Sequence, residues 1–191
     1  MNFGYMFSSF IATEQLSFDL KKLEQKCYRI KDDDQGCFIS NYKGWHSSNI
    51  TENDFFQPLL NEIEKKSNDL NKELGINANQ KIHGAWININ QKNCFNEPHN
   101  HLSNNCFLSG VFYISVPEKS GILKFLNNQT PTENWINNKQ IEQYNCFNSN
   151  VWKIHPKENL LVLFPSWLSH YVLPNESDYN RISIAFNTKL I

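Results

Sequence analysis

The chain has 191 residues, a formal net charge of −1, 40% hydrophobic residues and 14% aromatic residues. This length and apolar content suit one folded domain over residues 1–191 and exclude a disordered protein. The near-neutral charge gives no reason to expect nucleic acid or an anionic membrane as a partner, and no apolar run approaches the roughly 18 residues of a membrane span. Because the apolar N-terminus lacks the basic start of a signal peptide, we expect a cytoplasmic location.

Residues 1–80 are predicted to form a helical support. A first helix is expected over an apolar stripe with helical spacing, and a turn-rich stretch follows over residues 31–49. A second helix has Pro58 in its first turn and Gly75 at its end. The two stripes comprise Leu16, Leu20, Leu23 and Cys27, and then Leu59, Leu60, Ile63, Leu70 and Leu74.

Over residues 81–191 the pattern changes to short extended segments separated by Pro, Gly and Asn clusters. This pattern predicts a mainly β core, either a sandwich, a barrel or a jelly roll. The polar residues 127–150 are predicted to form an insert loop, which is either a lid or a surface insertion. The predicted strands cover residues 82–89, 107–116, 122–126, 160–164, 170–173 and 181–186.

Two histidines stand close together, at His99 and His101. On a strand, residues i and i+2 point to the same face, so both side chains can reach one atom. A third ligand has to come from another strand, and His170, which follows a buried strand and a proline turn, is the candidate. Histidines in an ordinary core or on the surface are the alternative interpretation.

Cysteine and arginine usage are also informative. The five cysteines are an odd number without a C-x-x-C pair, which indicates free thiols rather than a disulfide framework or a zinc ribbon. The lysine-rich chain has only two arginines, Arg29 and Arg181. On the strand that Arg181 begins, Arg181 and Ser183 share the face opposite Ile182 and Ile184. A cation beside a hydroxyl in a jelly-roll interior suits a carboxylate ligand.

The order of these residues resembles the 2-oxoglutarate- and Fe(II)-dependent dioxygenases, in which H-x-(D/E), a distal histidine and an arginine follow one another. The likeness is closest to the small oxygenases of this kind found in bacteria and their phages, which have a prolyl-hydroxylase-like core. The matching segments are residues 40–47, 98–101, 108–114, 163–170 and 181–187.

The resemblance implies a double-stranded β-helix, of the jelly-roll or cupin type, with N-terminal supporting helices in a mainly β, α+β arrangement. It also implies ferrous iron bound by His99 and by His170 as the distal ligand, with positions left for 2-oxoglutarate and O2. His101 stands where most of the superfamily has Asp or Glu. We interpret His101 as the third ligand, with Glu97 or a water molecule as alternatives.

The resemblance further implies how 2-oxoglutarate binds. Arg181 is similar to the arginine that binds the distal carboxylate of 2-oxoglutarate, with Ser183 as its hydroxyl partner. Asn88 lies on the strand that often contributes an amide or a phenol in this family, and Tyr113 is placed to point inward. Each of these two is alternatively an ordinary strand residue.

The remaining histidines and tryptophans have structural interpretations. His83 and His155 are predicted to be structural or surface residues, and His46 either lines the pocket or caps a turn. The tryptophans that we expect in the core, rather than as a platform for substrate, are Trp45, Trp86, Trp152 and Trp167.

The leading functional interpretation is an oxygenase that hydroxylates a C–H bond and converts 2-oxoglutarate to succinate and CO2. Its partners are O2 and an unknown substrate, either a protein or peptide side chain or a small metabolite, and a homodimer is left open. One alternative is a three-histidine, cupin-type dioxygenase without 2-oxoglutarate, which would have no need of Arg181. The other is a jelly-roll binding module without catalysis.

Overall fold

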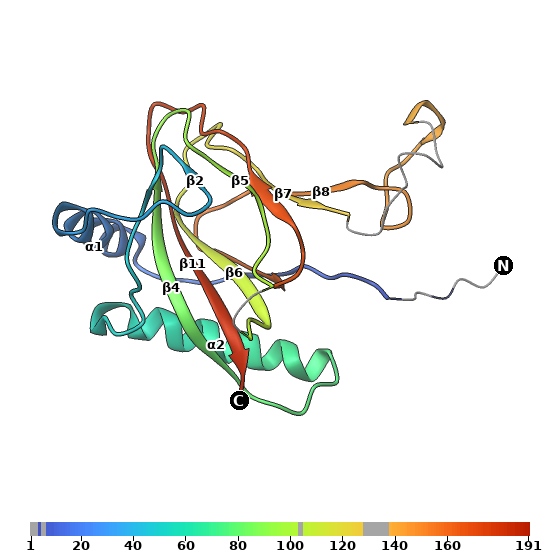
Figure 1. Ribbon diagram of the computed structural model, residues 1–191, viewed down its shortest axis with the longest axis horizontal. Coiled ribbons are helices and arrows are strands. Elements are labelled where there is room, and N and C mark those ends of the chain that lie inside the picture. The colour runs from blue at the N-terminus through green and yellow to red at the C-terminus, as the bar shows by residue number, and fades with distance from the viewer. Residues whose placement is uncertain (1–3, 5–6, 103–104, 128–137) are drawn as a thin grey trace.

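The computed structural model describes residue 4 and residues 7–102, 105–127 and 138–191. Two antiparallel sheets face each other, and two helices cover the outer side of the larger sheet (Figure 1). This arrangement confirms the predicted fold class, mainly β with flanking helices in a jelly roll. No helix in the described part of the chain is long and apolar enough to cross a bilayer.

The larger sheet has six strands within the described residues, in the order β1-β9-β6-β11-β4-β3. Their bounds are Ala12–Gln15, Leu160–Pro165, Leu108–Ser115, Arg181–Leu190, Gln80–Asn90 and Trp45–His46. The smaller sheet has five strands in the same part of the chain, in the order β2-β5-β10-β7-β8. Their bounds are Asn41–Tyr42, Phe95–His99, His170–Val172, Leu123–Leu126 and Val151–Ile154.

Both predicted helices are present. Helix α1 spans Leu20–Asp33, and the Asp19 side chain caps it by accepting a hydrogen bond from the Lys22 backbone N–H. Helix α2 spans Gln57–Glu73, follows the short 3-10 turn η1 (Asp54–Phe56) and has Pro58 in its first turn. Leu16 precedes α1 rather than belonging to it, so this part of the predicted stripe is wrong.

Two apolar layers hold the molecule together. In the outer layer, the buried faces of α1 and α2 pack against the larger sheet, which explains the near-continuous apolar character of its strands. In the inner layer, Val111 and Tyr113 from β6 and Phe164 from β9 meet Phe125 from β7. Because the inner layer fills only part of the space between the sheets, polar residues from both sheets line the remainder.

The structure has more strands than the sequence indicates. Strands β2 and β3 lie in the stretch predicted as turns, and β1 and β8 have no predicted counterpart. A strand of two residues has no readable alternation, and β2 and β3 exist because they pair with the distant β5 and β4. Trp152 and Trp167 are exposed, so their predicted core positions are wrong.

The insert predicted over residues 127–150 is only partly described, because residues 128–137 lie outside the described residues. Its two ends are joined by a hydrogen bond from the Asn127 backbone N–H to the Asn150 carbonyl. The described remainder contains the short 3-10 turn η2 (Asn138–Gln140) and exposed Tyr144 and Phe147. In Figure 1 this segment projects away from the two sheets.

Candidate metal centre

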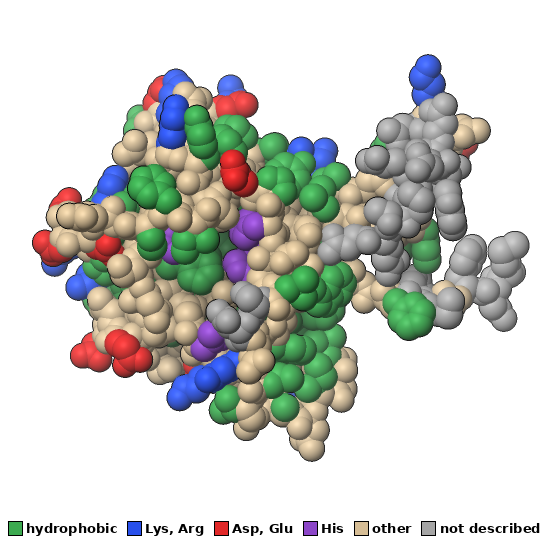
Figure 2. Space-filling model, viewed as in Figure 1, with side chains coloured by type: hydrophobic (Ala, Val, Ile, Leu, Met, Phe, Trp, Pro, Cys, Tyr) green, Lys and Arg blue, Asp and Glu red, His purple; other side chains and the backbone are tan. Residues whose placement is uncertain are grey.

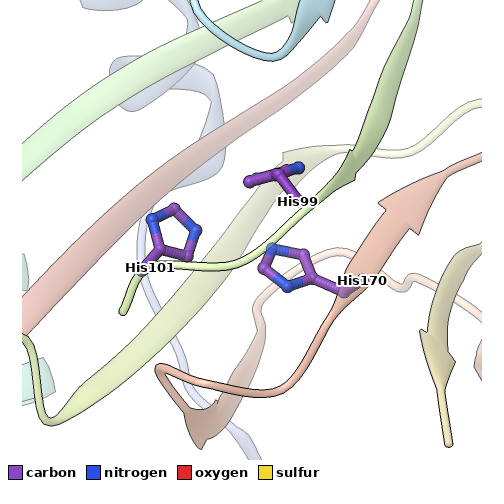
Figure 3. Close-up of side chains that lie close together, drawn as sticks. All are labelled: His99, His101 and His170. Carbon is purple, nitrogen blue, oxygen red and sulfur yellow. The ribbon is translucent and has the colours of Figure 1, made fainter. Parts of the chain in front are cut away.

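Three histidines converge between the two sheets. His99 ends β5, His170 begins β10, and the two residues are directly paired across the strands. The side chain of His101 turns toward them from the chain beyond β5 (Figure 3). Their possible ligand atoms all lie within 4.8 Å of one another, close enough to hold one metal ion. The ring centroids are 4.4 Å apart for His99 and His170, 5.1 Å for His99 and His101, and 5.3 Å for His101 and His170.

The prediction that His99 and His101 converge as same-face neighbours on one strand is only partly right. Strand β5 ends at His99, so His101 is not its same-face neighbour on a continuous strand. The position of His101 depends instead on the turn after β9, where the His101 backbone N–H donates to the Ser166 carbonyl over 2.8 Å. A contact between residues so far apart along the chain cannot be read from local spacing.

Two of the rings have a fixed orientation. Nδ1 of His99 lies 2.6 Å from the Glu97 carbonyl oxygen, and Nδ1 of His170 lies 2.9 Å from the Leu168 carbonyl oxygen. A carbonyl oxygen only accepts hydrogen bonds, so each Nδ1 carries the proton and donates it. The lone pair is then on Nε2, which is the arrangement of metal-binding histidines with a hydrogen-bonded orienting partner.

Burial keeps the three imidazoles neutral. Together with a smaller effect of repulsion from His99, burial lowers the pKa of His101 to about 4 and that of His170 to about 3. Burial also lowers the pKa of His99, against a smaller raising effect of its hydrogen bond to Glu97. Since a metal binds the neutral ring, these histidines are prepared to bind one at neutral pH.

Glu97, the alternative source of a third ligand, has an exposed side chain that is outside this group of ligand atoms. Its contribution to the centre is the backbone carbonyl that orients His99. Among the described residues, none that lines the pocket containing the histidines is acidic. Figure 2 shows histidine side chains in a hollow on this face of the molecule, with hydrophobic side chains deeper inside.

Arg181 lies at the other end of this pocket. Its side chain is 3% exposed, and Nη1 donates to the Ser120 carbonyl over 2.6 Å. Gly121 leaves room for it, because a Cβ at that residue would lie 2.8 Å from Nη1. Within the described residues no carboxylate forms an ion pair with Arg181. Burial lowers the pKa of Arg181, and a buried, unpaired guanidinium is costly unless an anion accompanies it.

The other three predicted contacts form one row beside Arg181. Ser183 on β11 pairs with Asn88 on β4 and with Tyr113 on β6, and all three are buried and line the pocket. The Asn88 Oδ1 atom is buried and has no hydrogen-bond partner among the described residues. Burial raises the pKa of Tyr113 to about 12, so its phenol stays protonated and can donate a hydrogen bond.

These residues fit Fe(II) and 2-oxoglutarate. Three imidazole nitrogens can bind the metal, while the buried guanidinium and two hydroxyls can donate hydrogen bonds to a dicarboxylate. Sequence reasoning missed one wall of the pocket, because Trp86 lines it and stacks on His46 with centroids 5.2 Å apart and planes 12° apart. The available signal was strand alternation, which puts Trp86 on the same face of β4 as Asn88.

Solved structures with the same fold are known. This chain is 13% identical to a Pseudomonas putida prolyl-4-hydroxylase, with a TM-score of 0.66 over 94% of this chain and 92% of that one. The viral collagen prolyl hydroxylase of Paramecium Bursaria Chlorella virus-1, in complex with 2-oxoglutarate, is 13% identical, with a TM-score of 0.61 over 95% and 96%. HygX from Streptomyces hygroscopicus, with nickel, 2-oxoglutarate and hygromycin B bound, is 8% identical, with a TM-score of 0.64 over 95% and 83%. These likenesses confirm the predicted double-stranded β-helix.

Comparison with curated proteins gives no match. A family model described as "Putative 2OG-Fe(II) oxygenase" matches residues 84–187, where 2OG is 2-oxoglutarate. The match covers more than half of the chain and includes the three histidines, Arg181 and the row of Asn88, Tyr113 and Ser183. The chain therefore belongs to this family of Fe(II)- and 2-oxoglutarate-dependent oxygenases, as its sequence motifs predicted.

Proposed function

We propose that this oxygenase binds Fe(II) through His99, His101 and His170, and binds 2-oxoglutarate between the metal and Arg181. The observation that carries the proposal is the buried Arg181 guanidinium. In the described part of the chain it has no acidic partner, and no acidic residue lines its pocket. A cupin-type enzyme without 2-oxoglutarate would leave this buried charge without a counterion.

The roles of the residues follow from their chemistry. Nε2 of His99 and of His170 would donate to the metal while their Nδ1–H groups keep the rings in place. Arg181 would bind the distal carboxylate of 2-oxoglutarate with its remaining N–H groups, because only one of its donors is engaged by Ser120. The Ser183 hydroxyl and the Tyr113 phenol would donate further hydrogen bonds to that carboxylate or its neighbour.

When bound, iron supplies the activation of O2 that the amino acids cannot provide. The overall reaction balances as R–H + O2 + 2-oxoglutarate → R–OH + succinate + CO2. The chain holds the co-substrate in one orientation and excludes water with the apolar side chains of Leu123, Phe164 and Phe186 beside the pocket. The substrate R–H is a protein or peptide side chain or a small metabolite.

We also propose that the enzyme acts in the reducing cytosol. All five cysteines, which lie within the described residues, are free thiols. Structural disulfides are typical of oxidising compartments, so unpaired cysteines favour the cytosol. Dimerisation stays a prediction, and the elution volume of the purified chain in size-exclusion chromatography tests it.

The test is succinate formation from isotopically labelled 2-oxoglutarate by the Fe(II)-loaded protein, with O2 uptake followed in parallel. We expect succinate in the wild type, none without iron, and a strong loss in Arg181→Lys. Arg29→Lys is the matched control, because Arg29 is exposed on α1. Oxygen uptake that is independent of 2-oxoglutarate would support the cupin alternative, and 2-oxoglutarate binding without turnover would support a binding module.

A further inference from the structure

The three histidines are not held in the same way. His99 and His170 each donate an Nδ1–H hydrogen bond to a backbone carbonyl, over 2.6 and 2.9 Å. His101 lies beyond the end of β5, and within the described residues its ring makes no hydrogen bond. Only its backbone N–H is anchored, to Ser166. Ring packing is therefore what remains to fix the orientation of the His101 side chain.

Three neighbouring rings provide that packing. One is the His99 ring, whose centroid lies 5.1 Å from that of His101 with an angle of 78° between the planes. The His101 ring lies 5.3 Å from the His170 ring, with an angle of 24° between the planes, and 6.1 Å from the Trp86 ring, with an angle of 40°. Trp86 is itself supported, because His46 stacks on it with an angle of 12° between the planes. A series of rings thus runs from His46 through Trp86 to His101.

The outer end of this series is held by strand pairing and hydrogen bonds. His46 is buried on β3 and pairs with Asn88 on β4, two residues after Trp86. Its Nδ1–H donates to the Ser47 carbonyl over 2.8 Å, and the Ser47 hydroxyl accepts the backbone N–H of Ile87 over 2.9 Å. This hydrogen bond joins the residues that directly follow His46 and Trp86. The pairing of β3 with β4 therefore holds the His46 and Trp86 rings next to each other.

We infer that Trp86, supported by His46, is a positioning residue that turns His101 toward the metal. The inference rests on the proposed ligand role of His101. A backbone carbonyl orients each of the other two histidines, and for His101 the contact with the Trp86 ring takes that place. Because a loosely held ligand spends part of its time turned away, loss of the Trp86 ring weakens metal binding through His101.

The experiment is a double-mutant cycle on metal affinity, with Co(II) as the probe and its visible spectrum as a second readout. The variants are Trp86→Leu, which keeps an apolar side chain but removes the ring, Trp86→Phe, His101→Ala, and Trp86→Leu combined with His101→Ala. Trp152→Ala is the matched control, because Trp152 is 48% exposed on β8 and does not line the pocket. Thermal unfolding of the metal-free variants checks that each one folds.

We expect Trp86→Leu to weaken Co(II) binding about tenfold, the lower end of the range for groups that orient a metal ligand, and to alter the spectrum as His101→Ala does. Trp86→Phe restores most of the affinity. In the His101→Ala background Trp86→Leu causes no further loss. Trp152→Ala binds Co(II) as the wild type does.

Three results would overturn parts of this account separately. If His101→Ala bound Co(II) as tightly as the wild type, the proposed ligand set would fail. If His101→Ala weakened binding while Trp86→Leu did not, the positioning role would fail and the ligand set would stand. If the two losses were additive, Trp86 would act independently of His101, which also contradicts the inference. Should Trp86→Leu not fold, His46→Leu takes its place and is expected to give a smaller loss with the same non-additivity.

Discussion

The two ends of the pocket are built in different ways. The Arg181 end lies on three long strands, β4, β6 and β11, whose pairing puts Asn88, Ser183 and Tyr113 in one row. The metal end lies where strands stop, because β5 ends at His99 and β10 begins at His170. Sheet register therefore fixes the residues proposed to bind 2-oxoglutarate, whereas local hydrogen bonds and ring packing fix the three histidines proposed to bind the metal.

This difference in construction predicts how the Arg181 end and the histidine end of the pocket respond to substitution. A residue fixed by register keeps its place when a neighbour changes, so variants at the Arg181 end should affect mainly the chemistry of the substituted group. A ring fixed by one hydrogen bond or one stacking contact depends on that partner. The metal end should therefore show a graded series of effects, from the firmly held histidines to the loosely held one.

The largest effect is expected for the firmly held pair. His99→Ala or His170→Ala should lower Co(II) affinity by more than the roughly 100-fold upper range for losing a group that only orients a ligand, and should abolish succinate formation. The reason is that each change removes a ligand nitrogen rather than its support. His155→Ala is the control, because His155 is exposed and is not one of the described residues that line the pocket. Unchanged Co(II) binding by His99→Ala would mean that the metal binds elsewhere.

The next effect concerns the other end of the pocket. Arg181→Lys should weaken 2-oxoglutarate binding by about 1.5–3 kcal/mol, the range for hydrogen bonds to charged groups, because an ammonium cannot reproduce the planar fork. Co(II) affinity should stay as in the wild type, which would demonstrate the independence of the two ends. Calorimetric titration of the metal-loaded protein with 2-oxoglutarate measures the loss. An unchanged affinity for 2-oxoglutarate would contradict the bidentate contact.

The contrast between residues fixed by sheet register and residues fixed by local contacts also explains what could be predicted from the sequence. Strand alternation placed Arg181 and Ser183 on the inward face of β11, and register then explains why Asn88 and Tyr113 adjoin them. His101 was predicted to converge with His99 for a reason that the structure corrects, since its place depends on a backbone contact with Ser166. Strand alternation could have placed Trp86 in the pocket beside Asn88, but no local pattern reveals that its ring will lie close to His101.

The fold shows the same limit. The long strands β4, β6, β9 and β11 were predicted in their correct places because burial on one or both faces leaves a readable pattern. The two-residue strands β2 and β3 were not, because they are defined by partners far along the chain. The sequence therefore predicted the long strands around Arg181 better than the strand ends that carry the histidines.

A smaller effect is expected for the loosely held histidine. His101→Ala should weaken Co(II) binding by less than His99→Ala and leave residual succinate formation, because two histidines and a water molecule can still bind the metal. His101→Asp should bind Co(II) more tightly than His101→Ala, since a carboxylate supplies a negative charge that the described lining residues of the pocket lack. Co(II) titrations of both variants test the order. A loss in His101→Ala as large as that in His99→Ala would remove the distinction between the histidines.

Metal-free protein should lose stability as the pH falls. The folded-state pKa values of about 4 for His101 and about 3 for His170 are below the unfolded value of about 6.5, so the unfolded chain binds more protons in this window. The melting temperature should therefore fall as the pH is lowered from about 6.5 toward 4. His101→Ala should show a shallower decline. A melting temperature independent of pH across this window would contradict the burial of neutral histidines.

The smallest effect is expected at Glu97, which adjoins the metal end but contributes through its backbone. Its carbonyl oxygen holds His99 at 2.6 Å, whereas its carboxylate is exposed and separate from the ligand group. Glu97→Gln keeps the backbone and removes one solvent-screened charge, so Co(II) affinity should change by no more than about twofold, as for exposed charges in general. Glu97→Pro is the informative contrast, because altering the backbone there disturbs the carbonyl that orients His99. If Glu97→Gln abolished Co(II) binding while His101→Ala did not, the carboxylate would be the third ligand, and the loosely held histidine would have another role.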